Sequence, residues 1–149
     1  ETSMAIDRKD PFTGYNFAIE LDGITGTGFK ECSGLDRTQA ASDYREGTDP
    51  TLGKRKIPGL VTWSNITLKR GLTTDRALWD WQDKAVRGKV DRRAISIILL
   101  DDTGAERMRW NVRGAWPIKW SGPSFDAGSD AIAIESLELA HEGIEVAKW

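Results

Sequence analysis

Residues 93–112 read RAISIILLDDTGAERMRWNV, two apolar stretches on either side of a short polar segment. The apolar run at 97–100 has the length of a buried strand. In the second stretch, Met108, Trp110 and Val112 alternate with polar residues, which is the period of a strand with one buried face. The intervening DDTG is typical of a tight turn. The sequence therefore predicts an antiparallel hairpin whose Trp110 points into the core.

The β pattern continues on both sides of this hairpin. Alternate residues from Tyr15 to Leu21 are apolar, and the Asp22-Gly23 pair that follows is typical of a hairpin turn. Within the segment 131–141 the apolar residues change phase, which indicates a bulge or a strand covered on both sides. Strands are expected over 15–21, 24–32, 39–45, 62–70, 93–100, 107–112, 115–120 and 131–141.

Residues 75–87 have the pattern of a helix. The Thr-Thr-Asp sequence that ends at Asp75 offers capping hydroxyls and an acid for the first turn, and Gly88 is suited to end the helix. An apolar stripe at helical spacing is formed by Leu78, Trp81 and Ala85. Trp79 lies off this stripe, so we expect it to face something other than its own domain. The fold class predicted from the residues is mainly β with one helix.

Length and charge exclude several classes of protein. The chain has 149 residues, which fits one domain, and 21 Lys and Arg against 23 Asp and Glu give a net charge of −2. This charge argues against general nucleic-acid binding, which needs a basic surface. No stretch approaches the roughly 18 consecutive apolar residues of a membrane span, and the N-terminus lacks the pattern of a secretory signal. We expect a soluble protein made in the cytoplasm.

Residues that could carry catalysis or bind a cofactor are scarce. The one histidine, His141, is expected to have a structural hydrogen-bonding role, and Cys32 to be a buried, inert thiol. One Cys and one His do not complete a structural zinc site, and the carboxylates lack the spacing of a calcium loop. The glycines of 23–28 and 47–54 fit neither a dinucleotide nor a phosphate loop. The sequence predicts no enzyme, no cofactor and no metal.

The segment 46–59 holds two prolines and three glycines, so it is predicted to be a long loop, neither helix nor ordinary strand. Loops of this length are usually functional, and charges of both signs beside apolar residues suit docking on another subunit. The alternative is a disordered, solvated loop. The residues expected to dock are Arg45, Glu46, Asp49, Leu52, Lys54, Arg55, Lys56 and Ile57.

Seven tryptophans are a large number for a domain of this size. They are compatible with an apolar core, with stacking on carbohydrate, or with large self-association surfaces. The residues therefore leave open a structural assembly protein and a carbohydrate-binding β-sandwich, and they favour an enzyme least.

Several short blocks occur in order across nearly the whole chain. They are Tyr15–Gly23, Gly28-Phe29, Cys32–Leu35, Tyr44–Gly47, Leu99–Asp101 with Gly104 and Trp110, Ala115–Pro123 and Ile134–Gly143. In this order the blocks resemble the phage-type tail tube proteins, which form the inner tubes of contractile injection systems. The resemblance extends more distantly to the tube protein of type VI secretion.

The resemblance implies an antiparallel β-sandwich or barrel with one flanking α-helix, which completes a continuous β-barrel in a six-membered ring. Rings would stack into a hollow tube, and contraction of a surrounding sheath would drive the tube and its cargo through a target envelope. The implied partners are other copies of the chain, the sheath protein, baseplate or spike and tube-terminating proteins, and an effector protein or DNA in the lumen, without membrane anchoring. Assembly would occur in the bacterial cytoplasm, and the product would be a tail or injection particle that is cytoplasmic, extracellular or part of a virion.

The resemblance also assigns parts of the chain. Residues 1–12 are expected to be a flexible arm and 13–149 a single tail-tube domain. The segment 46–59 would reach between neighbouring subunits and stacked rings, where Lys54, Arg55 and Lys56 would meet acidic groups of an adjacent subunit. The helix would face the sheath through Asp75, Trp79, Asp80, Asp83 and Lys84. Candidate lumen residues are Asn16, Ala18 and Glu20, or Thr67 and Lys69. The alternatives are a non-contractile tail tube, a tube-end adaptor and a carbohydrate-binding β-sandwich.

Overall fold

Strands make up most of the regular structure of the chain. The computed structural model describes residues 11–14, 16–22, 28–50 and 52–149. Residues 1–10 of the predicted flexible N-terminal segment, Tyr15 and residues 23–27 and 51 lie outside the described residues. In the described part the elements are β1 (Phe17–Leu21), β2 (Glu31–Ser33), β3 (Arg37–Tyr44), β4 (Arg55–Trp63), β5 (Ile66–Gly71), α1 (Ala77–Val86), β6 (Arg93–Leu100), β7 (Glu106–Ser121), β8 (Ile134–Ala140) and β9 (Gly143–Lys148). The mainly β fold class with one helix is confirmed.

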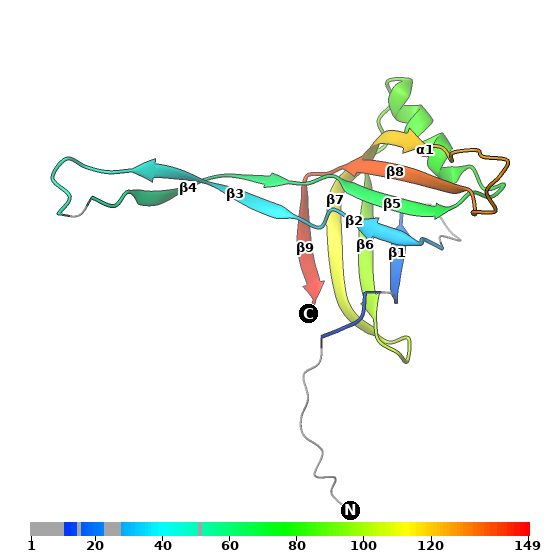
Figure 1. Cartoon of the computed structure of the whole chain (residues 1–149), viewed down its shortest axis with the longest axis horizontal. Coiled ribbons are helices and arrows are strands. Elements are labelled where there is room, and N and C mark those ends of the chain that lie inside the picture. The colour runs from blue at the N-terminus through cyan, green and yellow to red at the C-terminus, as the bar shows by residue number, and fades with distance from the viewer. Residues whose placement is uncertain (1–10, 15, 23–27, 51) are drawn as a thin grey trace, which may run out of the picture.

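Strand pairing forms two layers that share β7. The first sheet has the order β1-β6-β7-β9, and the second sheet has the order β7-β8-β5-β2; all pairs are antiparallel. Figure 1 shows that the strands of the two sheets cross, so β7 passes from one layer into the other. We call these two sheets with helix α1 the body. The predicted hairpin over 93–112 is confirmed as the pair β6–β7.

Strand β7 is continuous over 16 residues. The prediction of two separate strands, 107–112 and 115–120, is wrong. Gly114 adopts a φ of +60°, which lets the strand bend while its two halves pair with different partners. A side chain at this position would also meet Glu142, because a Cβ would lie 2.9 Å from that carboxylate group.

Two further predictions about strands are wrong. The strands on either side of the Asp22-Gly23 turn do not pair with each other, because β1 pairs with β6 and β2 pairs with β5. Strand β9, Gly143–Lys148, was not predicted, although it pairs with β7. Turn residues indicate where the chain reverses, but burial of the apolar faces decides which strands become neighbours.

The phase change within 131–141 comes from a buried charge. In β8 the alternate residues from Glu135 to Leu139 are buried, whereas Ile132 precedes the strand and is exposed. Glu135 is accommodated inside because Arg70 Nε donates a hydrogen bond to its Oε1 over 3.0 Å. The register irregularity between β7 and β8 lies in β7.

The core lies between the two sheets and against α1. Its buried apolar side chains are Ile19, Leu21, Ile95, Ile97, Val112 and Ala115 in the first sheet, Ile66, Leu68, Leu137 and Leu139 in the second, and Leu78 and Trp81 in the helix. The indole of Trp81 is fully enclosed, and its N–H donates to the backbone carbonyl of Asp91 over 2.7 Å. The polar atom of this large side chain is therefore satisfied inside the protein.

Helix α1 is shorter than the predicted 75–87. The N-cap residue Arg76 makes no side-chain capping bond, so the predicted hydroxyl cap is wrong. The carboxylate of Asp75 instead accepts the backbone N–H of Ala77 over 3.0 Å. Leu78 and Trp81 of the predicted apolar stripe are buried in the core, whereas Ala85 is only half-buried, and Gly88, with a φ of +84°, follows the end of the helix as expected.

Strands β3 and β4 form a separate two-stranded sheet that projects from the body (Figure 1). We call residues 37–63 the arm. Residues 55–59 belong to β4, so the prediction that they are loop is wrong, and among the described residues the irregular segment covers only 45–50 and 52–54. Pro58 is compatible with a strand because each strand of the arm has one open edge. All residues of β3 are exposed.

Candidate assembly surfaces

The tip of the arm is organised by one carboxylate. Asp49 Oδ2 accepts the backbone N–H of Glu46 over 2.9 Å, and its Oδ1 accepts Arg55 Nη2 over 2.6 Å. Arg45 Nη2 reaches the carbonyl of the same aspartate at 3.4 Å. Leu52 points into solvent, with 91% of its surface exposed. The structure thus brings five of the predicted docking residues together at the tip.

The remaining predicted docking residues, Lys54, Lys56 and Ile57, lie beside Arg55 at or near the start of β4. Lys56 is ion-paired with Asp43 across the arm, and Arg55 with Asp49, so both cations are already compensated within their own chain. Lys54 has no hydrogen bond or ion pair within the described part of the chain. Contact of Lys54, Arg55 and Lys56 with an adjacent subunit stays a prediction. Of the three, only Lys54 has a charge that is not paired within the described part of its own chain.

Helix α1 presents charged residues in intrahelical pairs. Asp80 accepts Arg76 Nε over 3.2 Å, and Asp83 accepts Arg87 Nε over 2.9 Å, both at the i,i+4 spacing. Lys84 lies 3.6 Å from Asp91. These pairs are exposed, so they stabilise the helix little and leave their polar atoms accessible.

Two of the predicted helix residues are placed differently from the rest. Trp79 packs edge-on against Trp120 of its own body, with ring centroids 4.9 Å apart, and keeps 42% of its surface exposed. Trp79 therefore contacts its own body, contrary to the expectation that it faces something else, and contact of its exposed part with the sheath stays a prediction. Asp75 turns back to the body and approaches Arg70 Nη1 at 3.4 Å.

Arg70 connects three elements inside the body. Besides Glu135 of β8 and Asp75 before α1, its guanidinium lies over the ring of Phe29, 5.9 Å from the centroid. Sequence reasoning missed this site, but a signal was present. Arg70 continues the apolar alternation of Ile66 and Leu68, and a charge in that phase points into the core.

The solvent face of the first sheet carries compensated charges. Arg109 donates to Glu20 over 3.0 Å and to Glu106 over 2.7 Å, and hydrogen bonding to Glu20 first of all raises its pKa. The hydrogen bond that Arg109 donates to Glu106 lowers the pKa of Glu106. Ser96 donates to Asn111 over 2.8 Å on this face. These contacts join β7 to β6 and, across β6, to β1, and they pair the charges of Glu20, Glu106 and Arg109 with one another.

Groups suited to catalysis are not brought together in the described residues. His141 Nε2 lies 2.8 Å from the carbonyl of Ser64, and its Nδ1 accepts the N–H of Gly143 over 3.2 Å, which confirms a structural role. Burial raises the pKa of the Cys32 thiol to about 11, so the thiolate nucleophile is scarce at neutral pH. Within the described ranges, the Cys, His, Asp and Glu residues form no group that could hold a metal ion.

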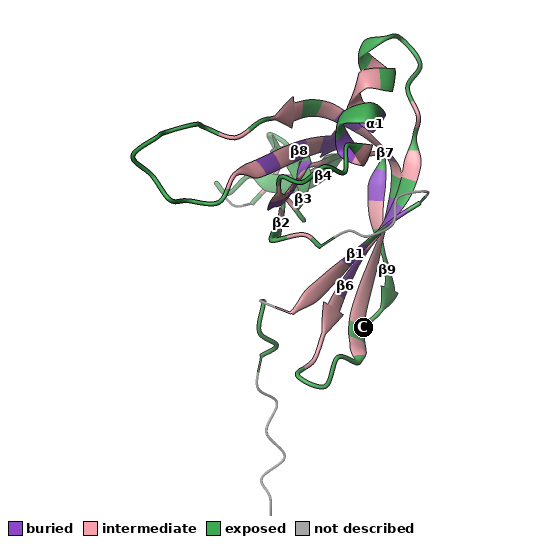
Figure 2. Ribbon diagram, turned by 90° about the vertical axis from the view of Figure 1, so that its right-hand side faces the viewer, coloured by how far each residue is buried: buried purple, intermediate pink, exposed green. Residues whose placement is uncertain are grey.

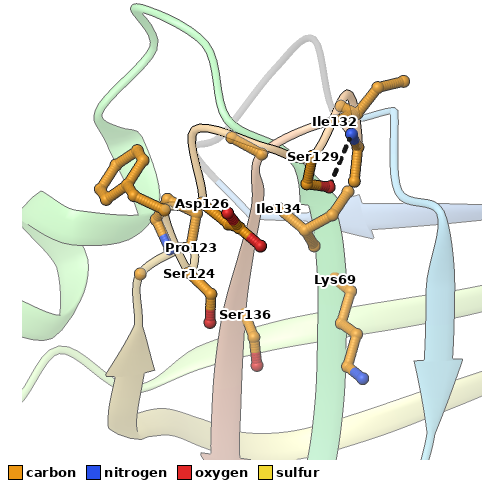
Figure 3. A pocket seen from close by; sticks show the side chains of 12 residues that line it. Lys69, Pro123, Ser124, Asp126, Ser129, Ile132, Ile134 and Ser136 are labelled. Atoms are coloured by element: carbon orange, nitrogen blue, oxygen red, sulfur yellow. Dashed lines mark hydrogen bonds between the residues drawn. The ribbon is translucent and has the colours of Figure 1, made fainter.

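A hollow of about 730 Å³ lies between the loop 122–133 and the second sheet (Figure 3). Hydroxyl groups, Lys69 and Asp126 share its lining with Ile132 and Ile134, and no tryptophan takes part. A carbohydrate site of the expected kind, built on exposed tryptophans, is not formed there. The hollow also lacks a nucleophile paired with a base.

In the part of the chain that the structure describes, no helix is long and apolar enough to cross a membrane.

Comparison with known families and structures gives consistent matches. The model of the T4-like virus tail tube protein gp19 family matches residues 13–145. A chain in the sheath–tube complex of an extracellular contractile injection system, PVC, in its extended state is 31% identical, with a TM-score of 0.83 over 95% of this chain and 94% of that one. A chain in the tube-terminating cap of the anti-feeding prophage is 30% identical, with a TM-score of 0.86 over 97% and 96%.

More distant structures share the fold alone. Hcp1 from Flavobacterium johnsoniae is 14% identical, with a TM-score of 0.56 over 91% of this chain and 97% of that chain. A comparison with curated protein sequences gives no match.

Proposed function

Because the chain belongs to the T4-like virus tail tube protein family, we propose that it forms six-membered rings that stack into the inner tube of a contractile injection apparatus. The observation that carries this proposal is the family match over residues 13–145, supported by likeness to sheath–tube and cap structures at about a third identity. Sheath contraction would drive the tube through a target envelope, with an effector protein or DNA in its lumen. The chain itself acts as a structural subunit, without enzymatic activity or a cofactor.

The free edges of the first sheet support ring closure. Strands β1 and β9 lie at the two ends of this sheet, and each uses only one of its edges for pairing among the described strands. Unpaired edges are templates for another chain, and pairing β1 of one subunit with β9 of the next satisfies both. Six such sheets would form a closed barrel, whose lumen is lined by the polar face that carries Glu20, Arg109 and Asn111.

Helix α1 would then lie on the exterior of the tube, where the sheath surrounds it. The accessible carboxylates of Asp80 and Asp83 on this helix are available to basic groups of a sheath protein. Baseplate or spike and terminating proteins would cap the ends of the tube. We place assembly in the bacterial cytoplasm and the finished tube in a tail or injection particle.

A role at the end of the tube is the second candidate, because a structure of a tube-terminating cap contains a chain similar to this one. A tube-end protein forms single rings that do not stack with one another, whereas a tube subunit forms long stacks. The two functions are therefore separated by the length of the assembly.

Negative-stain electron microscopy of the purified protein, alone and with its sheath protein, tests the proposal. Hollow rings and tubes are expected. Light scattering that shows only monomers at high concentration, with and without sheath, would contradict it. Rings that never stack would favour the tube-end role.

A further inference from the structure

The apolar face of the first sheet extends beyond the part that the second sheet covers. Near the crossing of the sheets, Ile19 and Ile97 are 4% exposed. Phe17, farther along β1, and Trp110, opposite Ile97 on β7, are only half-buried, and Trp149 beyond the end of β9 is 78% exposed. Figure 2 shows this gradient, with buried residues at the crossing and intermediate or exposed residues toward the ends of β1, β6 and β9.

Two hollows lie along this uncovered face. One of about 290 Å³ and one of about 330 Å³ share Leu35 and Trp110 in their linings. Trp110 and Trp149 meet edge-on with centroids 6.1 Å apart. We call the second hollow the aromatic groove; its lining includes Leu35, Trp63, Trp110, Ile144, Val146 and Trp149. An uncovered apolar groove of this kind marks an interaction site.

The arm lacks the partner that a two-stranded sheet needs. Isolated two-stranded hairpins are marginally stable in water, and packing of one face is the usual remedy. In the arm, Ile57 is 44% exposed and Leu60 is 82% exposed. Because the arm points away from its own body (Figure 1), its outer half does not reach its own groove. Another copy of the chain is therefore the surface available to it.

We propose that the arm of one copy seats Ile57 and Leu60 in the aromatic groove of a neighbouring copy. The inference rests on the proposed assembly into a tube and names the contact that joins its subunits. One molecule offers an uncovered strand pair and the other an uncovered groove, so the contact is heterologous and repeats from copy to copy.

Charges on the two surfaces agree with this seating. The cations beside Ile57 are already neutralised, Lys56 by Asp43 and Arg55 by Asp49, so burying this part of the arm leaves no isolated charge. Lys54 of the arm and Asp36 at the groove carry opposite charges. Neither side chain has a hydrogen bond or ion pair among the described residues. The lining also holds Arg37, whose guanidinium lies over the ring of Trp63, so within the groove only Asp36 complements the charge of Lys54.

Cysteine cross-linking between two variants tests the seating. Both variants carry Cys32→Ser; one adds Leu60→Cys and the other adds Val146→Cys. The variants are mixed before assembly and treated with a short bis-maleimide. A cross-linked dimer that contains one of each is expected in the assembled fraction, and its loss is expected when Leu60→Cys is replaced by Val86→Cys, an exposed position on α1.

Two outcomes separate the seating from the assembly itself. The seating is overturned if rings and tubes form but the mixed dimer does not, including in pairs that use Ile57→Cys in place of Leu60→Cys or Trp149→Cys in place of Val146→Cys. The proposed function stands in that case. Absence of any assembly in the parent protein would overturn both. A cross-link from Val146→Cys to Ile6→Cys of the same chain, in place of the mixed dimer, would assign the groove to residues 1–10.

A substitution provides the second readout. Leu60→Glu is expected to abolish long tubes in micrographs, while the matched Val86→Glu variant forms tubes of normal length. Normal tubes with Leu60→Glu would overturn the seating, provided that circular dichroism shows both variants folded.

Discussion

In the body, Leu68, Leu137 and Trp81 have lost nearly all contact with solvent, whereas in the arm every residue of β3 is exposed. The body buries most of its apolar face internally, apart from the aromatic groove, and pairs its buried charges. The arm keeps its ion pairs but leaves its apolar residues uncovered. The difference separates residues that stabilise the subunit from residues whose partners lie in another subunit.

The buried ion pair of the body is expected to give the largest effect. Glu135→Ala leaves Arg70 buried with only Asp75 at its far side, and loss of one partner of a buried pair costs about 3–5 kcal/mol. Urea unfolding measures this loss. The double variant Arg70→Met with Glu135→Leu is expected to recover most of it, because no isolated charge remains. A loss below about 1 kcal/mol for Glu135→Ala would contradict a buried pair.

Truncating apolar residues compares the two regions directly. Leu68→Ala in the body is expected to lower the free energy of unfolding by about 2–5 kcal/mol, because it leaves a cavity. Leu60→Ala in the arm changes an exposed side chain and is expected to alter monomer stability by less than about 0.5 kcal/mol. Equal losses in urea unfolding of the monomers would show that the arm packs on its own body.

Charge reversal at the arm is expected to act on assembly. The triple variant Lys54→Glu, Arg55→Glu and Lys56→Glu should block stacking but leave single rings, because strand pairing between subunits lies elsewhere. Each charge contributes about 1 kcal/mol or less, and repetition around the ring multiplies the effect. Microscopy measures tube length, and normal long tubes would contradict the prediction.

A matched swap sharpens this test. Asp43→Lys combined with Lys56→Asp keeps the ion pair across the arm with reversed direction. It is expected to form tubes, whereas Lys56→Asp alone shortens them.

Charge reversal on α1 is expected to act on the sheath. Asp80→Lys or Asp83→Lys removes one i,i+4 pair, which costs about 0.3–0.5 kcal/mol of stability. Rings should remain intact while sheath assembly weakens, as seen by co-sedimentation with sheath protein. Normal loading of sheath would show that the helix does not contact it.

The smallest expected effect is the pH dependence of the body. The pKa of Asp101 is held well below its usual range, first by the Thr103 hydroxyl and then by the Ala105 N–H. A lowered folded-state pKa contributes stability above the ordinary carboxyl pKa of about 4, and this stability is lost as the pH falls through the folded value. Asp101→Asn should reduce the slope of stability against pH below about pH 4. An unchanged slope in urea unfolding would contradict this.

Local patterns predicted much of the fold. Alternation predicted β1 and the pair β6–β7, and the apolar stripe predicted α1. Residues 46–59 of the arm were predicted as a loop because prolines and glycines mark breaks in an ordinary sheet. A two-stranded ribbon with open edges accepts them, and nothing local shows that edges are open.

The sequence by itself determined the class of the fold, the family and the part of the core that comes from β1, β6 and α1, because alternation and composition are local properties of the chain. Tertiary structure alone decided that β1 pairs with β6, that β7 serves both sheets, and that Glu135 meets Arg70 inside. It also decided that Trp110 and Trp149 share an uncovered groove. These pairings join residues far apart in sequence, and their selection depends on which apolar faces can be buried together, a property of the whole chain.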